Sequence, residues 1–101
     1  MIVIVFRSRL RDGIDLEELA RHGERMVALA TAMPGFRSYK DFAAEDGENV
    51  SIVEFESLET LEAWRSHPEH RQVQARAREA FMSEYHIQVC QPVRDYAYRL
   101  S

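Results

Sequence analysis

The 101-residue sequence predicts one α+β domain in which a four-stranded antiparallel sheet carries its helices on one face. Two observations predict this fold. Strand-like and helix-like segments follow one another in the order β-α-β-β-α-β, and no linker or low-complexity stretch divides the chain. A chain of this length buries roughly two-thirds of its unfolded surface, which is enough for one core. We therefore expect a single domain over residues 1–101, with a core over about residues 1–90 and a C-terminal arm over residues 91–101.

The composition excludes several classes of protein. An apolar content of 46% is too high for a disordered chain. The longest apolar run, residues 2–6, is too short for a membrane helix or for the core of a signal peptide. Thirteen basic and seventeen acidic residues give a net charge of −4, which argues against nucleic acid or a membrane as the main partner. Cys90 is the single cysteine, so we expect no disulfide framework and a cytoplasmic location.

The first segment is a strand and the second is a helix. Residues 2–6 are β-branched or aromatic, and polar residues follow them over residues 7–12. Asp15 is a good N-cap, and apolar residues then recur at spacings of three, four and seven, which predicts an amphipathic helix. This pattern places Gly23 on the inward face of the helix and His22 on the opposite face. A Pro-Gly pair ends the helix.

A β-hairpin and a short helix come next. Residues 36–42 and 50–55 have the composition of strands, and Glu45-Asp46-Gly47 between them supplies a turn with a glycine. Ser57 is placed to cap a short helix that carries Leu58, Leu61 and Trp64 inward.

The second helical region is split at a proline. His67 precedes Pro68, and a helical conformation is disfavoured before proline, so one helix ends there and another begins at Pro68. The second part carries His70 on its inward face. Residues 85–89 form the fourth predicted strand, and residues 91–98 continue it as an arm. The resulting order is that of a ferredoxin-like fold.

Two of the predicted strands are apolar on both faces, although the helices in this topology cover only one face. Both the even and the odd positions of residues 2–6 are apolar, and the same holds for residues 50–55. A second copy packed sheet to sheet would cover the remaining face, and Tyr96, Tyr98 and Leu100 of the arm would reach across it. The alternative is a set of tolerated surface apolar residues. We expect a homodimer through the sheet face.

His70 is the first candidate for a chemical role. It lies in the first turn of its helix, where unpaired N–H groups disfavour an imidazolium, so a neutral imidazole beside a pocket can remove a phenolic proton. The alternative is a buried histidine bonded to the backbone. His67 is expected at the cap position, and we also predict it as a substrate contact. The two histidines would bind a metal only with further ligands, and the sequence contains no further cluster.

Four other residues are candidates for lining a pocket. Trp64 is either part of the core or a platform for an aromatic substrate. Met26 can form an adaptable wall on the first helix. Tyr39 and Tyr85 place phenols either in the pocket or against a partner subunit, because a shift of one residue in register exchanges the two faces of a strand.

Three motifs resemble those of the antibiotic biosynthesis monooxygenase domain. They are Met33-Pro34-Gly35-Phe36, Phe55-Glu56-Ser57 and Trp64-Arg65-Ser66-His67-Pro68-Glu69-His70, and the resemblance extends to about Val89. It implies a dimeric α/β barrel of ferredoxin-like subunits with an apolar pocket between sheet and helices. Members oxidise small aromatic or quinol-like substrates with molecular oxygen and without a bound cofactor, and others degrade haem or have no known activity.

Several catalytic positions of that family carry other residues here. Phe6 and Gln74 stand near the asparagine and histidine positions of the haem-degrading members, so haem degradation is not expected. Ser51, Phe55 and Leu61 stand at the asparagine, tryptophan and tyrosine positions of the polyketide-oxidising members. The resemblance and these differences together leave two hypotheses for the function. One is a non-catalytic, small-ligand-binding or stress-related homodimer. The other is cofactor-independent oxidation, with catalysis by His70 and Trp64 and substrate contacts from His67, Tyr39, Tyr85 and Met26.

Overall fold

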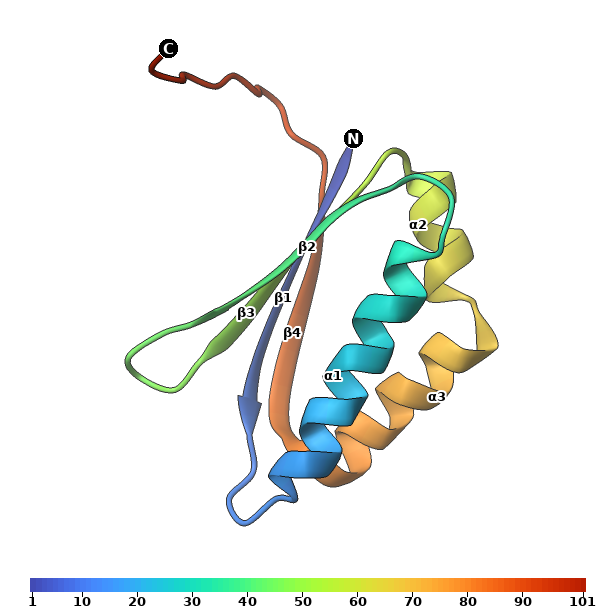
Figure 1. The fold of residues 1–101 in the computed structure, drawn as a ribbon, viewed down its shortest axis with the longest axis vertical. Coiled ribbons are helices and arrows are strands. Elements are labelled where there is room, and N and C mark those ends of the chain that lie inside the picture. Colours follow the sequence, from blue (N-terminus) through green and yellow to red (C-terminus); the bar gives the residue numbers. More distant parts are fainter.

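The computed structural model describes residues 1–101 and has seven regular elements and one π-helical segment. In chain order they are β1 (Ile2–Leu10), α1 (Leu16–Thr31), β2 (Phe36–Ala43), β3 (Asn49–Phe55), α2 (Leu58–Arg65), α3 (Pro68–Arg76), the π-helical η1 (Ala77–Phe81) and β4 (Met82–Cys90). The strands form one antiparallel sheet in the order β2-β3-β1-β4, and the helices lie on one face of it (Figure 1). The predicted α+β, ferredoxin-like fold is confirmed. None of the helices combines the length and the apolar character that crossing a membrane requires.

Short-range contacts set the starts of the helices as the sequence predicts. The Asp15 carboxylate accepts hydrogen bonds from two N–H groups in the first turn of α1. Ser57 and Thr60 form a capping box at the start of α2. At the start of α3, Nδ1 of His67 accepts from the backbone N–H of Glu69 at 3.1 Å. Each cap satisfies backbone groups that would otherwise lack partners.

Two strand boundaries differ from the prediction, and Arg11 lies beside both. β1 continues to Leu10, and β4 begins at Met82, directly after the π-helical η1 that ends the predicted helix. The Arg11 guanidinium donates to three backbone carbonyls at this junction, and its backbone N–H donates to a fourth at 2.8 Å. These contacts hold the end of β1 against the end of η1, and the four carbonyls belong to Arg78, Glu79, Phe81 and Met82.

Gly35 is the tightest glycine of the fold, and its replacement by alanine is expected to lower the free energy of unfolding by about 2 to 3 kcal/mol. Its φ is +80°, and a Cβ there would lie 2.5 Å from Cγ2 of Thr60. The strain of an alanine in the left-handed conformation would therefore add to the cost of displacing Thr60, which is part of the cap of α2. Urea denaturation measures the loss. Gly13→Ala is the matched control, because Gly13 has a φ of +68° but nothing within 4 Å of its Cβ position. Equal losses in the two variants would show that the Thr60 contact contributes nothing.

The two faces of the sheet differ in what covers them. One face packs against the helices, and its buried hydrophobic residues are Ile2, Ile4, Val53 and Phe55, in contact with Ala30, Leu61 and Trp64. The opposite face, here called the open face, carries Val3, Val5, Val50 and Ile52 on the two central strands. These four half-exposed residues form the open-face patch. The prediction that β1 and β3 are apolar on both faces is therefore confirmed.

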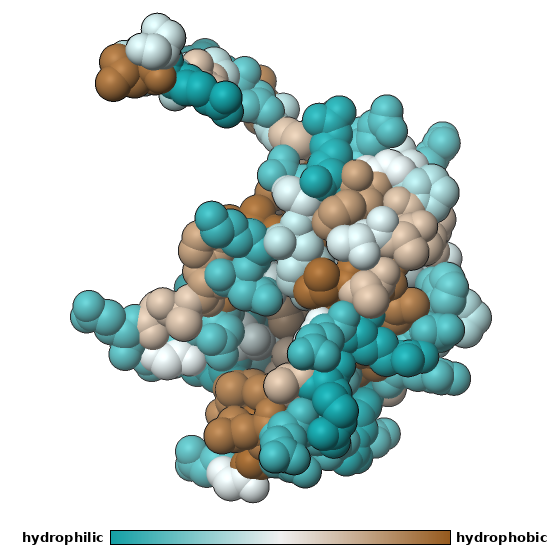
Figure 2. All heavy atoms as spheres, viewed as in Figure 1, coloured by the Kyte–Doolittle hydropathy of each residue, from teal (hydrophilic) through white to brown (hydrophobic).

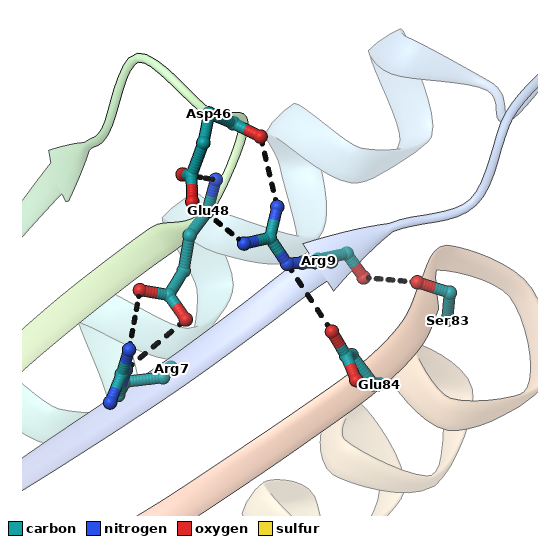
Figure 3. A network of polar contacts seen from close by, with 6 residues as sticks. All are labelled: Arg7, Arg9, Asp46, Glu48, Ser83 and Glu84. Carbon is teal, nitrogen blue, oxygen red and sulfur yellow. Dashed lines mark hydrogen bonds and ion pairs between the residues drawn. The ribbon is translucent and has the colours of Figure 1, made fainter.

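A charged network adjoins the open-face patch where β1 meets the β2–β3 hairpin and β4 (Figure 3). Arg7 donates to both carboxylate oxygens of Glu48, at 3.1 and 2.9 Å. Arg9 pairs with Asp46 at 2.9 Å and with Glu84 at 3.3 Å. The pKa of Asp46 lies below its usual value, chiefly because its carboxylate accepts hydrogen bonds from the Glu48 N–H and from the Arg9 guanidinium. The network surrounds one end of the patch with paired charges.

Residues 91–101 form an arm without helix or strand. The arm leaves the sheet on the side away from the helices, and it stands clear of the rest of the molecule (Figures 1 and 2). Its large apolar residues, Val93, Tyr96, Tyr98 and Leu100, are each at least 83% exposed. Exposed apolar groups gathered on one segment are typical of a surface that binds a partner.

Candidate functional site

A cavity of about 710 Å³ lies between the helix-covered face of the sheet and the helices. This volume lies in the range of small-molecule sites. Fourteen of its 24 lining residues are hydrophobic, so it suits a mainly apolar ligand. The apolar lining from the sheet includes Ile4, Phe6, Ile87 and Val89, and that from the helices includes Leu19, Met26, Leu61 and Trp64.

Trp64 and His70 lie side by side in the helical wall of this cavity. Their ring centroids are 4.4 Å apart, and the two residues retain only 6% and 5% exposure. Nε1 of Trp64 and Nδ1 of His70 have no hydrogen-bond partner. Buried polar atoms without partners are rare in proteins. The pair therefore holds an unused donor and an unused ring nitrogen at the wall of an apolar cavity.

The surroundings of His70 favour its neutral form. Burial lowers its pKa below the ordinary value of 6.5, a backbone hydrogen bond with Arg65 works in the opposite direction, and the nearby charges of Arg65 and His67 lower it further. The sequence predicts the neutral form from the helix N-terminus, whereas the structure makes burial the larger cause. A neutral imidazole can accept a proton at pH 7.

His22 corrects the prediction for α1. The helical pattern places it on the outward face, but it lines the cavity and its ring meets the edge of Phe81 at a centroid distance of 5.2 Å. α1 packs against α3 as well as the sheet, so its flank is covered too. Burial lowers the pKa of His22, while the charge of Glu18 opposes this shift.

Tyr39, Asp41 and Ser51 form a polar corner of the cavity on β2 and β3. Asp41 lies opposite Ser51 in the strand register, and the Ser51 hydroxyl donates to the Asp41 carboxylate. Tyr39 lies two residues before Asp41 and shares its face of the sheet. Burial and the Asp41 charge raise the pKa of Tyr39, and a hydrogen bond with Ser51 opposes the rise. Sequence analysis missed Asp41 as a site residue.

Five of the six predicted site residues line the cavity: Trp64, His70, Met26, Tyr39 and Tyr85. Both tyrosines face the helices, which settles the register left open by the sequence, and the Tyr85 hydroxyl accepts from Arg78 at 3.2 Å. His67 does not line the cavity, because its imidazole is used to cap α3. The expectation that His67 contacts a substrate stays a prediction, and its place outside this cavity does not support it. No group of three or more His, Cys, Asp or Glu side chains lies close enough to hold a metal ion.

Gly23 lies in the cavity wall within α1, and no atom lies within 4 Å of where its Cβ would be. Gly23→Ala is expected to raise the free energy of unfolding by about 0.5 to 1 kcal/mol, since glycine is costly inside a helix. Thermal denaturation measures this gain. Ala20→Gly, at an exposed position of the same helix, is the converse control and is expected to lose a similar amount. An unchanged or lower stability of Gly23→Ala would show that a methyl group does not fit at this position, so that the glycine is needed for packing.

The model of the family described as antibiotic biosynthesis monooxygenase matches residues 1–76. The chain belongs to the antibiotic biosynthesis monooxygenase family. The uncharacterized protein YqjZ of Bacillus subtilis (strain 168) is 30% identical to this family member over 66 residues. That match covers 65% of this chain and 58% of YqjZ, so it spans less than two thirds of the relative.

Two solved structures are similar to this chain over most of its length. Rv0793 from Mycobacterium tuberculosis has a TM-score of 0.81 at 22% identity, with 95% of this chain and 98% of Rv0793 covered. A variant of SnoaB, a cofactor-independent oxygenase from Streptomyces nogalater, has a TM-score of 0.79 at 14% identity, with 93% and 94% covered. At these identities the comparison establishes a shared fold.

Proposed function

We propose that this member of the antibiotic biosynthesis monooxygenase family oxidises a small aromatic, quinol-like substrate with molecular oxygen and without a bound cofactor. The observation that carries the proposal is the Trp64–His70 pair, which lines a mainly apolar cavity and in which each ring has a buried nitrogen without a partner. The family match and the fold shared with the oxygenase SnoaB support it.

In this mechanism His70 is the base. Its neutral imidazole accepts the proton of a phenolic hydroxyl, and the resulting phenolate supplies electrons to oxygen. For an anthrone-type substrate the reacting methylene group supplies four electrons. One oxygen atom becomes the new carbonyl oxygen, and the other leaves as water with the two methylene hydrogens. His70 then returns its proton to the product.

Trp64 has two roles in the same scheme. Its indole, stacked on Phe55, forms part of the apolar wall beside the substrate ring, and its unpartnered Nε1–H can donate to the oxyanion that develops on the substrate. A donor aimed at developing charge in a dry site lowers the barrier to the reaction.

Oxygen uptake with a panel of dihydroxynaphthalenes and anthrones tests the proposed function. We expect saturable uptake above the uncatalysed rate by protein treated with a chelator, with one molecule of oxygen consumed for each anthrone converted. If no member of the panel is consumed faster than in buffer, the proposed oxidation is wrong.

A second candidate function is the binding of a small apolar ligand without chemistry. It is favoured by Ser51, Phe55 and Leu61, which stand where the polyketide-oxidising members carry catalytic residues. Saturable binding of the same compounds without oxygen uptake would select this function.

We place the working form of the protein in the cytoplasm, as a homodimer packed through the open faces. The open-face patch has no cover within the chain, and the arm carries exposed apolar residues on that side of the sheet. A second copy fits because one chain supplies both the patch and the arm, and a two-fold axis lets each arm lie against the sheet of the other protomer. The paired charges around Arg7 and Arg9 would then form a polar rim.

A further inference from the structure

We propose that the polar corner of Tyr39, Asp41 and Ser51 is a second anchoring site of the cavity, which binds a hydroxyl or amino donor of an aromatic ligand and disfavours a carboxylate. It deepens the proposed function, because the ligand is taken to be an aromatic molecule held in the same cavity.

Asp41 supplies the charge of this anchor. It is the only carboxylate among the residues that line the cavity, and none of the ion pairs in the structure includes it. A carboxylate has about four acceptor positions, and the Ser51 hydroxyl uses one of them. The remaining positions are free for a donor on a ligand.

The sheet confines this polarity to one side of the cavity. Asp41, Ser51, Phe6 and Ile87 lie in one row across β2, β3, β1 and β4, all on the face that the helices cover. A flat ring lying against Phe6 and Ile87 therefore has an apolar surface beneath it and the Asp41 carboxylate at one edge. Tyr39 is protonated at neutral pH, and burial raises its pKa further, so it adds a neutral hydroxyl to the same edge.

Two cations also line the cavity, but each contacts another group. Arg78 donates to the Tyr85 hydroxyl at 3.2 Å, and Arg65 pairs with Glu62 at 3.4 Å. Both come from the helical side of the cavity. A ligand carboxylate placed at the polar corner would meet Asp41, and like charges repel.

The combination of this corner with His70 defines a class of substrate. His70 takes the proton of one hydroxyl at the helical wall, and Asp41 binds a second donor at the sheet. An aromatic ring with two hydroxyl groups satisfies both, whereas a ring of the same size without donors satisfies neither.

Anaerobic titration followed by fluorescence tests the corner separately from turnover, because Trp64 is the single tryptophan and lies in the cavity wall. The probes are 1,5-dihydroxynaphthalene, 1,5-dimethoxynaphthalene and 5-hydroxy-1-naphthoate. Asp41→Asn is expected to weaken binding of the dihydroxy probe about 10-fold, in line with loss of a charge-assisted hydrogen bond. It is expected to leave binding of the dimethoxy probe unchanged and to strengthen binding of the naphthoate several-fold.

The chain offers a matched control on the other face of the sheet. Ser38 donates to Glu54 at 2.8 Å, which is the same kind of serine–carboxylate contact between β2 and β3, but on the open face. Glu54→Gln is expected to leave binding of all three probes unchanged. Ser51→Ala, which removes only the hydroxyl that holds Asp41, is expected to weaken the dihydroxy probe about 3-fold.

The outcomes separate this inference from the proposed function. Equal binding of the dihydroxy probe by wild type and Asp41→Asn would overturn the anchor, even if the protein consumes oxygen. Binding that depends on Asp41, without any oxygen uptake, would uphold the anchor and remove the oxidation. If none of the three probes quenches Trp64, the anchor is wrong as well.

Discussion

Replacing His70 by alanine is expected to slow oxygen consumption about 100-fold, because proton transfer by a positioned base contributes roughly 100- to 10,000-fold. His70 is the buried ring beside Trp64 that has an unpartnered nitrogen in the cavity wall, and burial keeps it neutral. Initial rates with an anthrone, measured with an oxygen electrode, give the comparison. His70→Gln is the conservative control, since it retains hydrogen-bonding capacity but cannot take the proton. Equal rates for wild type and either variant would remove the proposed role of His70.

The pH profile distinguishes a base from a packing residue. The pKa of His70 is lowered, so the wild-type rate should fall only at pH values below 6.5, and this acid limb should be absent from the residual rate of His70→Gln. The same shift has a defined effect on stability. Between the folded-state pKa and 6.5 the unfolded chain binds more protons, so the free energy of unfolding should decrease as the pH falls through that interval. His22 acts in the same direction, and its contribution should persist in the His70 variants.

Ile52→Glu is expected to weaken the proposed dimer, with a dissociation constant at least about 100-fold higher, because placing a carboxylate in an apolar interface costs roughly 3 to 5 kcal/mol. Ile52 lies at the centre of the open face, paired with Val5 on one side and Lys40 on the other. Sedimentation velocity at micromolar concentration measures the change. Leu16→Glu is the matched control, since Leu16 is 70% exposed on α1 and should leave the dimer intact.

The arm gives an independent test of the same assembly. Ending the chain after Gln91 removes the four exposed apolar side chains and should weaken the dimer without unfolding the sheet, whose last strand ends at Cys90. A well-folded wild-type monomer of 11.8 kDa under the same conditions would show that the open face is not an interface.

Local patterns were sufficient to predict the parts of this fold that depend on near neighbours. The apolar residues at both even and odd positions of β1 and β3 predict that both faces of these strands are apolar, and Asp15, Ser57 and Pro68 predict where the helices begin. The extension of β1 was not predictable in this way. Arg7 and Arg9 look like the polar end of a strand, and their place in the sheet depends on partners about 40 and 75 residues away in sequence.

The candidate site shows the same division. Trp64 and His70 were predicted separately, each from the inward face of its own helix, on either side of the break at Pro68. Asp41 and Ser51 meet only through the register of the hairpin, which the turn between β2 and β3 determines. Ser51 could have been found by counting back in steps of two from Val53 and Phe55. His67 was predicted at the cap of α3, but a sequence pattern cannot show that capping keeps its ring out of the cavity.

The π-helical segment η1 determines which side chains of β4 reach the cavity. A π-helical turn spans one residue more than an α-helical turn, and β4 follows η1 without a loop to absorb a change in length. Side chains alternate along a strand, so removal of a single residue from η1 would reverse the orientation of every residue after it. His86, Gln88 and Cys90 would then take the places of Tyr85, Ile87 and Val89 in the cavity wall. Whether β4 presents hydrophobic or polar side chains to the binding site thus depends on one residue more or less in η1.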